Sequence, residues 1–291
     1  MIIRYCFFAI AAIFLIPNSA FGSEMILFYD KPATQWVEAI SIGNGRIGAM
    51  IFGGITEELI QFNEDTFWTL GPYNPVNPDA LAALPAARKL VFENRAKEAQ
   101  DLINQKMMAV PPKQAAYQPA GLLNISFQGH NQAKDYRREL DLERAVTSVV
   151  YKIGGVNFRR EIFSSAVDNV TIIHISSDRQ GKVNFTADFN AVQETKKINT
   201  VNESTISLEV NAGGALRCYS QVKAITQKGK VRIENNKLHI ENASSATLFL
   251  ASGTNYVKYN DVGGNPESIV EQQIKSASKK KSISKNTGRP Y

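Results

Sequence analysis

Two short patterns near the N-terminus contain residues whose types and spacing could do chemistry. Gly43, Gly45 and Gly48 have the G-x-G-x-x-G spacing with which dinucleotide-binding folds hold a pyrophosphate. The acidic pair Glu64-Asp65 follows about 20 residues later, where such folds keep the carboxylate that binds a ribose hydroxyl. The same two carboxylates could instead act as a general acid and a general base.

The glycine pattern does not sit in the local structure that a nucleotide site needs. A pyrophosphate-binding glycine loop must open a helix, because the amides of the first helical turn hold the phosphates. The residues after Gly48 are AMIFGG and ITEELIQF, which are rich in glycine and strand formers. They predict a hairpin that turns at Thr56-Glu57-Glu58, with the glycines allowing close strand packing and tight turns. We therefore expect no cofactor.

The segment from Asn63 to Pro78 is predicted to be an irregular loop, because strand alternation ends at Phe62 and glycine and prolines follow. Neighbours on a strand point to opposite faces, so Glu64 and Asp65 can face one substrate only if the chain bends there. Turn capping by these polar side chains is the alternative. Loops on a rigid sandwich often contact ligands or neighbouring domains. The candidates for an interdomain contact or a substrate rim are Asn63, Glu64, Asp65, Trp68 and Tyr73.

The remaining residues with reactive side chains indicate no further site. No metal-ligand spacing relates the three histidines, His130, His174 and His239, so no metal site is expected. Cys218 lies in the strand-like stretch ALRCYSQV and is predicted to be a small buried hydrophobe without a disulfide partner.

Period-two alternation dominates the chain and predicts the strands that would position these residues. KVNFTADF and STISLEV alternate apolar and polar side chains, and ATLFLASGTNY is apolar on both faces, as in a strand covered by two layers. Gly154-Gly155 and Asn235-Asn236 each join two such stretches as tight hairpin turns. The expected fold is mainly β, an antiparallel sandwich.

Helical patterns occur at two places. One insertion, NPDALAALPAARKLVFENRAKEAQDLINQKMM, has Asp79 as a cap and Pro85 as the expected point of division. Its apolar residues recur at helical spacing. A second helix is predicted to start at Asn265, with Pro266 in the first position and apolar residues at helical spacing after it.

The two ends of the chain differ from its body. Residues 1–22 read as a signal peptide, with Arg4 before a short apolar run and small residues ahead of cleavage at Ser23. The junction has no lipid-attachment pattern, so we expect an exported protein, periplasmic or secreted, without a membrane anchor. Without Arg4 and the six bases of the C-terminal stretch, 26 bases face 27 acids. A neutral body removes the argument for a nucleic-acid partner.

Several long stretches in the same order resemble glycoside hydrolase family 95, the α-L-fucosidases. They are YDKPATQWVEAISIGNGRIGAMIFGGITEELIQFNEDTFWTLGPYNPVNP, YQPAG, YRRELDLERAV, GVNFRREIFSS, GALRCYSQV and SSATLFLASGTNY. The resemblance covers about residues 25–274. One departure is Ala120-Gly121-Leu122-Leu123, where the family usually has a leucine-glycine-aspartate-leucine stretch.

The resemblance implies a β-supersandwich that precedes a helical linker and a catalytic (α/α)6 barrel. It implies inverting hydrolysis of terminal α-L-fucosides without a metal or organic cofactor, so the barrel is the intramolecular partner and fucosylated glycans are the substrates. The catalytic residues belong to that barrel, so none is carried over to this chain. The expected organisation is a signal peptide at 1–22, a β-sandwich domain at 23–264 and the start of the linker at 265–291.

Two functions are open at this point. The first is the structural N-terminal part of an exported fucosidase, truncated and inactive alone. The second is a free-standing carbohydrate-binding module in which Trp36, Trp68 and Tyr73 stack on sugar rings. The first is favoured because the resemblance extends into the linker. The tail after Lys279–Lys281 loses the helical pattern, and we expect a frameshift at that lysine run, where the codons can be an unbroken run of adenines.

Overall fold

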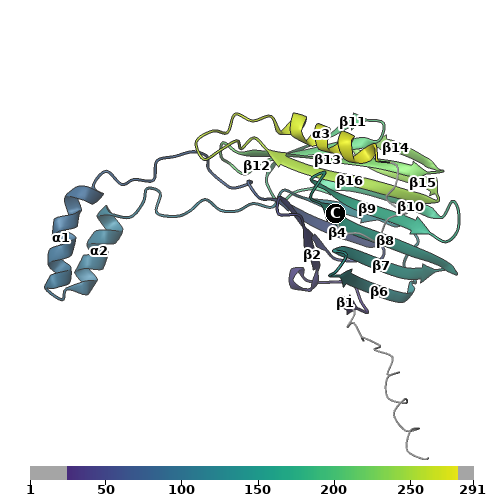
Figure 1. The fold of residues 1–291 in the computed structure, drawn as a ribbon, viewed down its shortest axis with the longest axis horizontal. Helices are drawn as coiled ribbons and strands as arrows, with labels where there is room; N and C mark the ends of the chain where they lie inside the picture. Colours follow the sequence, from purple (N-terminus) through teal and green to yellow (C-terminus); the bar gives the residue numbers. More distant parts are fainter. Residues whose placement is uncertain (1–24, 281–291) are drawn as a thin grey trace, which may run out of the picture.

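The protein is a sandwich of two antiparallel sheets (Figure 1). The computed structural model describes residues 25–280, so the predicted signal peptide at 1–22 and the tail after Lys280 lie outside the described residues. The nine-stranded sheet has the order β1 (Ile26–Tyr29), β6 (Lys134–Asp141), β7 (Val146–Ile153), β8 (Val156–Ser165), β9 (Val170–Ser177), β16 (Ser245–Thr254), β13 (Arg217–Gln227), β12 (Thr205–Asn211), β11 (Thr195–Asn202). The seven-stranded sheet has the order β14 (Lys230–Glu234), β15 (Lys237–Ala243), β10 (Val183–Asn190), β5 (Gly121–Ser126), β4 (Glu57–Glu64), β3 (Ile47–Ile51), β2 (Ile40–Gly43).

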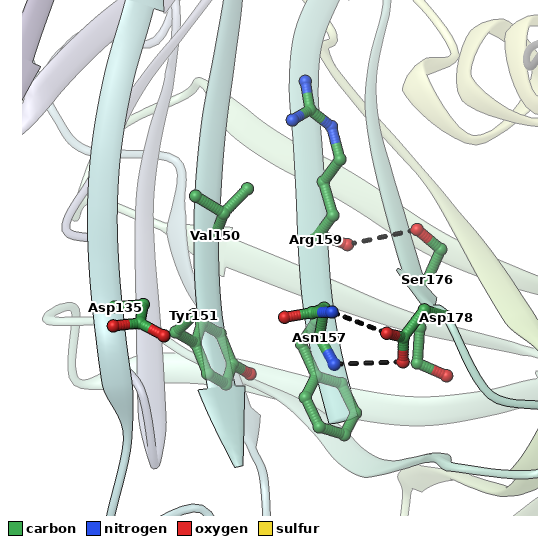
Figure 2. A pocket seen from close by; sticks show the side chains of 9 residues that line it. Asp135, Val150, Tyr151, Asn157, Arg159, Ser176 and Asp178 are labelled. Carbon is green, nitrogen blue, oxygen red and sulfur yellow. Dashed lines mark hydrogen bonds between the residues drawn. The ribbon is translucent and has the colours of Figure 1, made fainter. Parts of the chain in front are cut away.

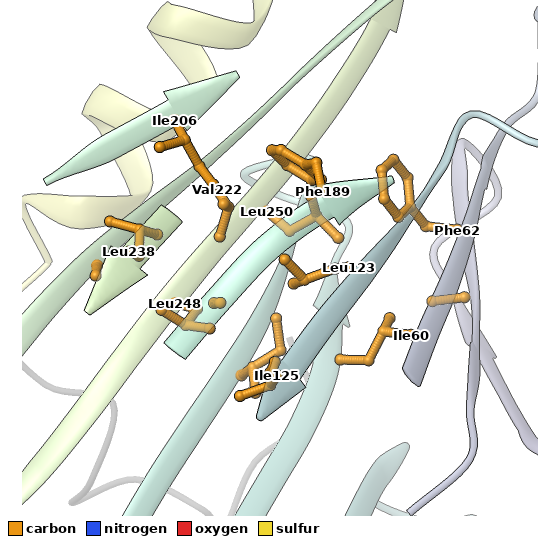
Figure 3. Close-up of a cluster of buried hydrophobic side chains, with 14 of the residues drawn as sticks. Ile60, Phe62, Leu123, Ile125, Phe189, Ile206, Val222, Leu238, Leu248 and Leu250 are labelled. Carbon is orange, nitrogen blue, oxygen red and sulfur yellow. The ribbon is translucent and has the colours of Figure 1, made fainter. Parts of the chain in front are cut away.

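The main core lies between the two sheets (Figure 3). The predicted alternation in β10 is confirmed, since its alternate apolar residues, Val183, Phe185, Ala187 and Phe189, are all buried. Side chains from both sheets fill the same layer, and those labelled in Figure 3 are Ile60, Phe62, Leu123, Ile125, Phe189, Ile206, Val222, Leu238, Leu248 and Leu250. The predicted antiparallel sandwich is thereby confirmed.

A third layer covers the outer face of the nine-stranded sheet. Helix α3 (Pro266–Ser278) packs Val270 and Ile274 against Phe249 of β16, which explains why this strand is apolar on both faces. The side chain of Asn265 accepts a hydrogen bond from the Ser268 amide at 3.0 Å, and Pro266 follows it, so the predicted helix start is confirmed.

Both predicted hairpin turns are present. Gly154 and Gly155 have φ of 55° and 79° between β7 and β8, and Asn235 and Asn236 have φ of 51° and 58° between β14 and β15. Positive φ at both central residues matches the right-handed twist of the flanking strands.

The glycine pattern forms part of a three-stranded meander and not the entrance to a helix. Gly43 of β2 pairs with Gly48 of β3, and Gly45 has a φ of 91° in the turn between these strands. The predicted turn at Thr56-Glu57-Glu58 is misplaced, because β4 already starts at Glu57 and the chain turns within residues 52–56. The buried Glu58 carboxylate holds this register, since it accepts a hydrogen bond from the Gly53 amide at 2.7 Å.

The helical insertion forms a hairpin that projects from the sandwich on two extended segments (Figure 1). Its helices are α1 (Ala80–Phe92) and α2 (Ala96–Lys106). The prediction that Pro85 divides the insertion is wrong, because α1 continues through it. The proline removes only the bond to the carbonyl of Leu81, an exposed residue in the first turn, where water can replace it. The chain reverses at Asn94, whose φ is 58°.

The predicted cap of α1 is not a hydrogen-bonding cap. Asp79 occupies the capping position, but its side chain makes no capping bond there. Its carboxylate instead pairs with the Lys106 ammonium at 3.1 Å and so ties the start of α1 to the end of α2. None of the helices within residues 25–280 is long and apolar enough to cross a membrane.

Candidate functional site

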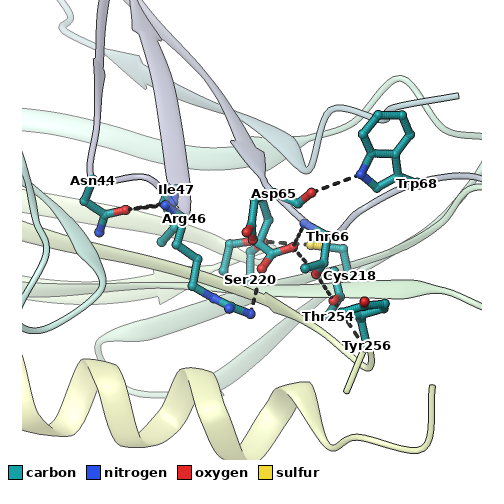
Figure 4. Close-up of polar contacts among 12 residues, drawn as sticks. Asn44, Arg46, Ile47, Asp65, Thr66, Trp68, Cys218, Ser220, Thr254 and Tyr256 are labelled. Atoms are coloured by element: carbon teal, nitrogen blue, oxygen red, sulfur yellow. Dashed lines mark hydrogen bonds and ion pairs between the residues drawn. The ribbon is translucent and has the colours of Figure 1, made fainter. Parts of the chain in front are cut away.

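The end of β4 is fixed by a buried carboxylate (Figure 4). The Glu64 side chain is fully buried, and its Oε2 accepts hydrogen bonds from the amide of Thr66 at 2.8 Å and from its hydroxyl at 2.6 Å. Arg46, in the turn between β2 and β3, places its Nη2 2.9 Å from Glu64 Oε1. The Thr66 hydroxyl also contacts the hydroxyl of Thr254 at the end of β16. This network joins the ends of strands from both sheets.

The electrostatics of Glu64 would suit an acid catalyst, but its position does not. Burial raises the pKa of Glu64 to about 7, against the opposing effects of the Thr66 hydroxyl and the Arg46 guanidinium. A general acid must touch the group that it protonates, and an enclosed side chain cannot do so. Glu64 therefore positions the chain around Thr66.

Asp65 points the other way. Its side chain is exposed, while its backbone is held on both sides: the amide donates to the Arg46 carbonyl at 3.0 Å, and the carbonyl accepts from Trp68 Nε1 at 3.0 Å. Adjacent residues on opposite faces are what strand geometry predicts. The structure therefore does not bring Glu64 and Asp65 together as an acid–base pair.

The other predicted site residues lie in different surroundings. Asn63 belongs to β4 and not to the loop, pairs with Gly48 and donates its amide to the carbonyl of Gln118 at 3.3 Å. Trp68 packs against Tyr117 with ring centroids 5.0 Å apart. Tyr73 is exposed on the extended segment that leads to α1.

Beside Asp65 and Trp68 lies an open cleft of about 480 Å³. One wall is the segment after β4, from Asp65 to Pro72, and the other is the segment between β16 and α3, with Tyr256, Tyr259 and Val262. Ala115 and Leu216 supply apolar contacts. Of the five candidate residues, only Asp65 and Trp68 line this cleft.

The sequence predictions missed the tyrosines of the cleft. Tyr256 and Tyr259 follow the apolar strand β16, and their aromatic side chains in NYVKY were the only available signal. Nothing in the spacing shows that the end of β16 lies beside the end of β4, because the order of strands in a sandwich is a long-range property. Trp36, an exposed residue of the short helix η1 (Trp36–Glu38), does not line the cleft.

A second open cavity, of about 490 Å³, lies over strands β7, β8 and β9 (Figure 2). Its most polar residues satisfy one another, since Asn157 donates from its amide at 3.0 Å and its side chain at 2.6 Å to the Asp178 carboxylate. A binding site needs polar groups that remain free for a ligand. Asp135 also lines this cavity, but its two aromatic rings, Tyr151 and Phe158, are buried, so the cleft at Asp65, with three exposed rings, is the stronger candidate.

A buried ionic cluster closes the opposite end of the core. Arg160 donates to the Glu58 carboxylate at 2.7 Å and to the Tyr151 hydroxyl at 3.0 Å, and its guanidinium lies 4.2 Å from the centre of the Phe127 ring. Both charged side chains are fully buried. Burial raises the pKa of Glu58, with the charge of Arg160 opposing this effect. The cluster has no access to a substrate, so its role is structural.

Two further titratable groups, Cys218 and His130, are also enclosed. Burial raises the pKa of Cys218 to about 12, and its thiol lies 3.2 Å from the Ser252 hydroxyl, so the predicted buried hydrophobe is confirmed. Burial, reinforced by Arg160, lowers the pKa of His130 to about 4, and this ring stacks on Phe127. Both groups stay neutral at neutral pH and serve packing.

The fold and its motifs define a recognisable class of domain. Residues 27–259 match the family described as glycosyl hydrolase family 65, N-terminal domain. The chain therefore belongs to this family of N-terminal domains of glycoside hydrolases, and the predicted relationship to such a domain is confirmed.

Particular relatives are named as fucosidases. Alpha-L-fucosidase 2 of Arabidopsis thaliana is 32% identical over 269 residues, which cover 83% of this chain and 32% of that protein. A protein of Aspergillus niger named "Probable alpha-fucosidase A" is 33% identical over 168 residues, which cover 54% of this chain and 21% of that protein. The chain thus spans at most about a third of the length of these two relatives.

Proposed function

We propose that this chain is the non-catalytic N-terminal β-sandwich of an exported α-L-fucosidase of glycoside hydrolase family 95. The observation that carries the proposal is the similarity of the sandwich itself to curated fucosidases, at 32% and 33% identity. The complete enzyme hydrolyses terminal α-L-fucosides of glycans with inversion, in carbohydrate metabolism. The catalytic barrel is the intramolecular partner of the sandwich.

The segment from Asp65 to Tyr73 is the part of the sandwich proposed to meet the barrel or to rim its active site. Its start is fixed by three contacts of Glu64, at 2.6 to 2.9 Å from Thr66 and Arg46. A loop held this firmly presents side chains with little loss of conformational entropy on contact. The exposed side chains of Trp68 and Tyr73 are available for such a contact.

The activity is tested with 2′-fucosyllactose as substrate. The 291-residue chain alone is expected to release no fucose, because the proposal places the chemistry in another domain. Turnover by the purified chain that a point change within residues 25–280 abolishes would contradict a non-catalytic role.

The loop is tested in the full-length Arabidopsis relative. Alanine at the positions aligned with Asp65 and Trp68 should lower fucoside turnover or the melting temperature, because each removes a contact to the barrel or substrate. Wild-type turnover and wild-type melting in both variants would show that the loop is only surface.

Export is tested separately. Expression of the chain from its own start codon should yield material outside the cytoplasm that begins at Ser23. Intact-mass measurement decides this, and a retained Met1 would contradict export by the predicted signal.

A further inference from the structure

The cleft beside β4 gathers exposed aromatic rings. Trp68, Tyr256 and Tyr259 are 40%, 38% and 82% exposed, and all three line the same open space. Two of them come from the segment after β16, which lies next to β4 through the contact of Thr254 with Thr66. Contact between exposed aromatic rings and water is unfavourable in free energy, and stacking of a flat apolar surface of a ligand on the rings would remove that contact.

The same cleft holds a carboxylate with free acceptor sites. Asp65 lines it, and within residues 25–280 its side chain has neither a hydrogen bond nor an ion pair. Its backbone is fixed by Arg46 and Trp68 (Figure 4), while its exposed side chain can rotate to meet a ligand. A carboxylate accepts hydrogen bonds from two neighbouring hydroxyl groups at once.

We propose that this cleft binds a neutral sugar residue of a glycan. Trp68 and Tyr259 stack on the apolar face of the ring, and Asp65 accepts hydrogen bonds from two adjacent hydroxyls. A carboxylate without a free cation beside it disfavours acidic sugars, because the nearby Arg46 is already paired with Glu64 at 2.9 Å. At about 480 Å³ the space is in the range of small-ligand sites.

The choice of sugar rests on the proposed function. The apolar side chains of Ala115, Leu216 and Val262 line the cleft and suit a methyl group on the ring. A terminal 6-deoxy sugar such as fucose has a methyl group where other hexoses have a hydroxymethyl group. We therefore assign a fucosylated glycan end to this cleft.

The test is binding of 2′-fucosyllactose to the purified 291-residue protein, measured by calorimetry, with lactose as the second probe. Tyr259→Ala and Asp65→Asn should each weaken binding about tenfold, the effect of losing one stacked ring or one charged acceptor. Tyr259 is so exposed that its removal leaves the fold intact. The matched control is Trp36→Ala, another exposed aromatic outside the cleft, which should bind like the wild type.

Each outcome separates the two proposals. No binding of either probe by folded protein, or an equal loss in Trp36→Ala and Tyr259→Ala, overturns the sugar site. The fucosidase assignment is not affected by that result, because it rests on the similarity to relatives named as fucosidases. Binding of lactose as tight as that of 2′-fucosyllactose, with the same loss in Tyr259→Ala, supports a sugar site and contradicts the choice of fucose.

Discussion

Replacing Arg160 by methionine should destabilise the protein more than any other change to a single charged residue discussed above. Arg160 donates to the carboxylate of Glu58, to the hydroxyl of Tyr151, and to the carbonyls of Gly54 and Ile55 at 2.5 and 3.1 Å. Methionine keeps much of the apolar stem but donates nothing. The variant therefore leaves four acceptors without this donor, and two of them, the Glu58 carboxylate and the Tyr151 hydroxyl, are buried.

The size of the loss follows from burial. Breaking a fully buried ion pair by removing one partner costs about 3–5 kcal/mol, because the remaining charge stays in the core. Glu58 can limit the loss by taking up a proton, since burial already raises its pKa. Whole domains are stable by about 5–15 kcal/mol, so the variant should lose a large part of the total.

Urea unfolding followed by far-UV circular dichroism measures this effect. The matched control is Arg159→Met, one residue away, where the guanidinium is about half exposed and pairs with Glu161 at 3.1 Å. A surface pair contributes about 0–1 kcal/mol, so this variant should unfold close to the wild type. If Arg160→Met costs less than about 1 kcal/mol, the ionic cluster does not hold the turn at residues 52–56 and the reasoning fails.

Three further predictions concern other parts of the fold. The pKa of Glu64 rises on folding from its usual 4.5 to about 7, so the stability that its protonated form contributes is present below about pH 4.5 and is lost as the pH rises to 7. The change in the free energy of unfolding amounts to about 3 kcal/mol. Glu64→Gln should remove this pH dependence when the free energy of unfolding is measured with urea at several pH values. An unchanged pH profile in the variant would exclude Glu64 as the source. Amides of α1 and α2, whose only fully buried residues are Ala87 and Ala99, should exchange with deuterium far faster than those of β16, and equal protection would contradict this. In Gly54→Ala the added methyl group would overlap the Glu57 carbonyl oxygen, and the variant should lose about 1–3 kcal/mol of stability. In Gly48→Ala the methyl group meets only the Ile42 carbonyl oxygen, at 3.9 Å, so this variant should be tolerated. Equal melting temperatures of the two variants would refute the steric argument.

Local patterns predicted the elements of the sandwich well. Alternation in β10, the turns at Gly154-Gly155 and Asn235-Asn236, and the two-sided apolar strand β16 all depend on residues close in sequence. The start of α3 at Asn265 depends on a cap and a proline next to each other. Such features need no knowledge of the rest of the chain.

Long-range contacts account for two of the errors. The turn before β4 was displaced because Glu58 is a charged residue that reads as surface, while Arg160, about a hundred residues away, makes it a core residue. The predicted set of site residues was incomplete, because Tyr256 and Tyr259 lie beside Trp68 only through the packing of the two sheets. Sequence spacing records neither contact.

Glu64 and Asp65 are adjacent in the sequence, yet one carboxylate is buried and the other is exposed. Glu64 is the last residue of β4 and Asp65 is the first residue after it, and the alternation of the strand places the first side chain in the core and the second in solvent. The buried member uses its lone pairs on Thr66 and Arg46, and its raised pKa reflects enclosure and not a reaction. The exposed member has no partner for its carboxylate within residues 25–280. A perturbed pKa therefore points here to the residue that shapes this end of β4, and our proposal gives the contact with a ligand to its exposed neighbour.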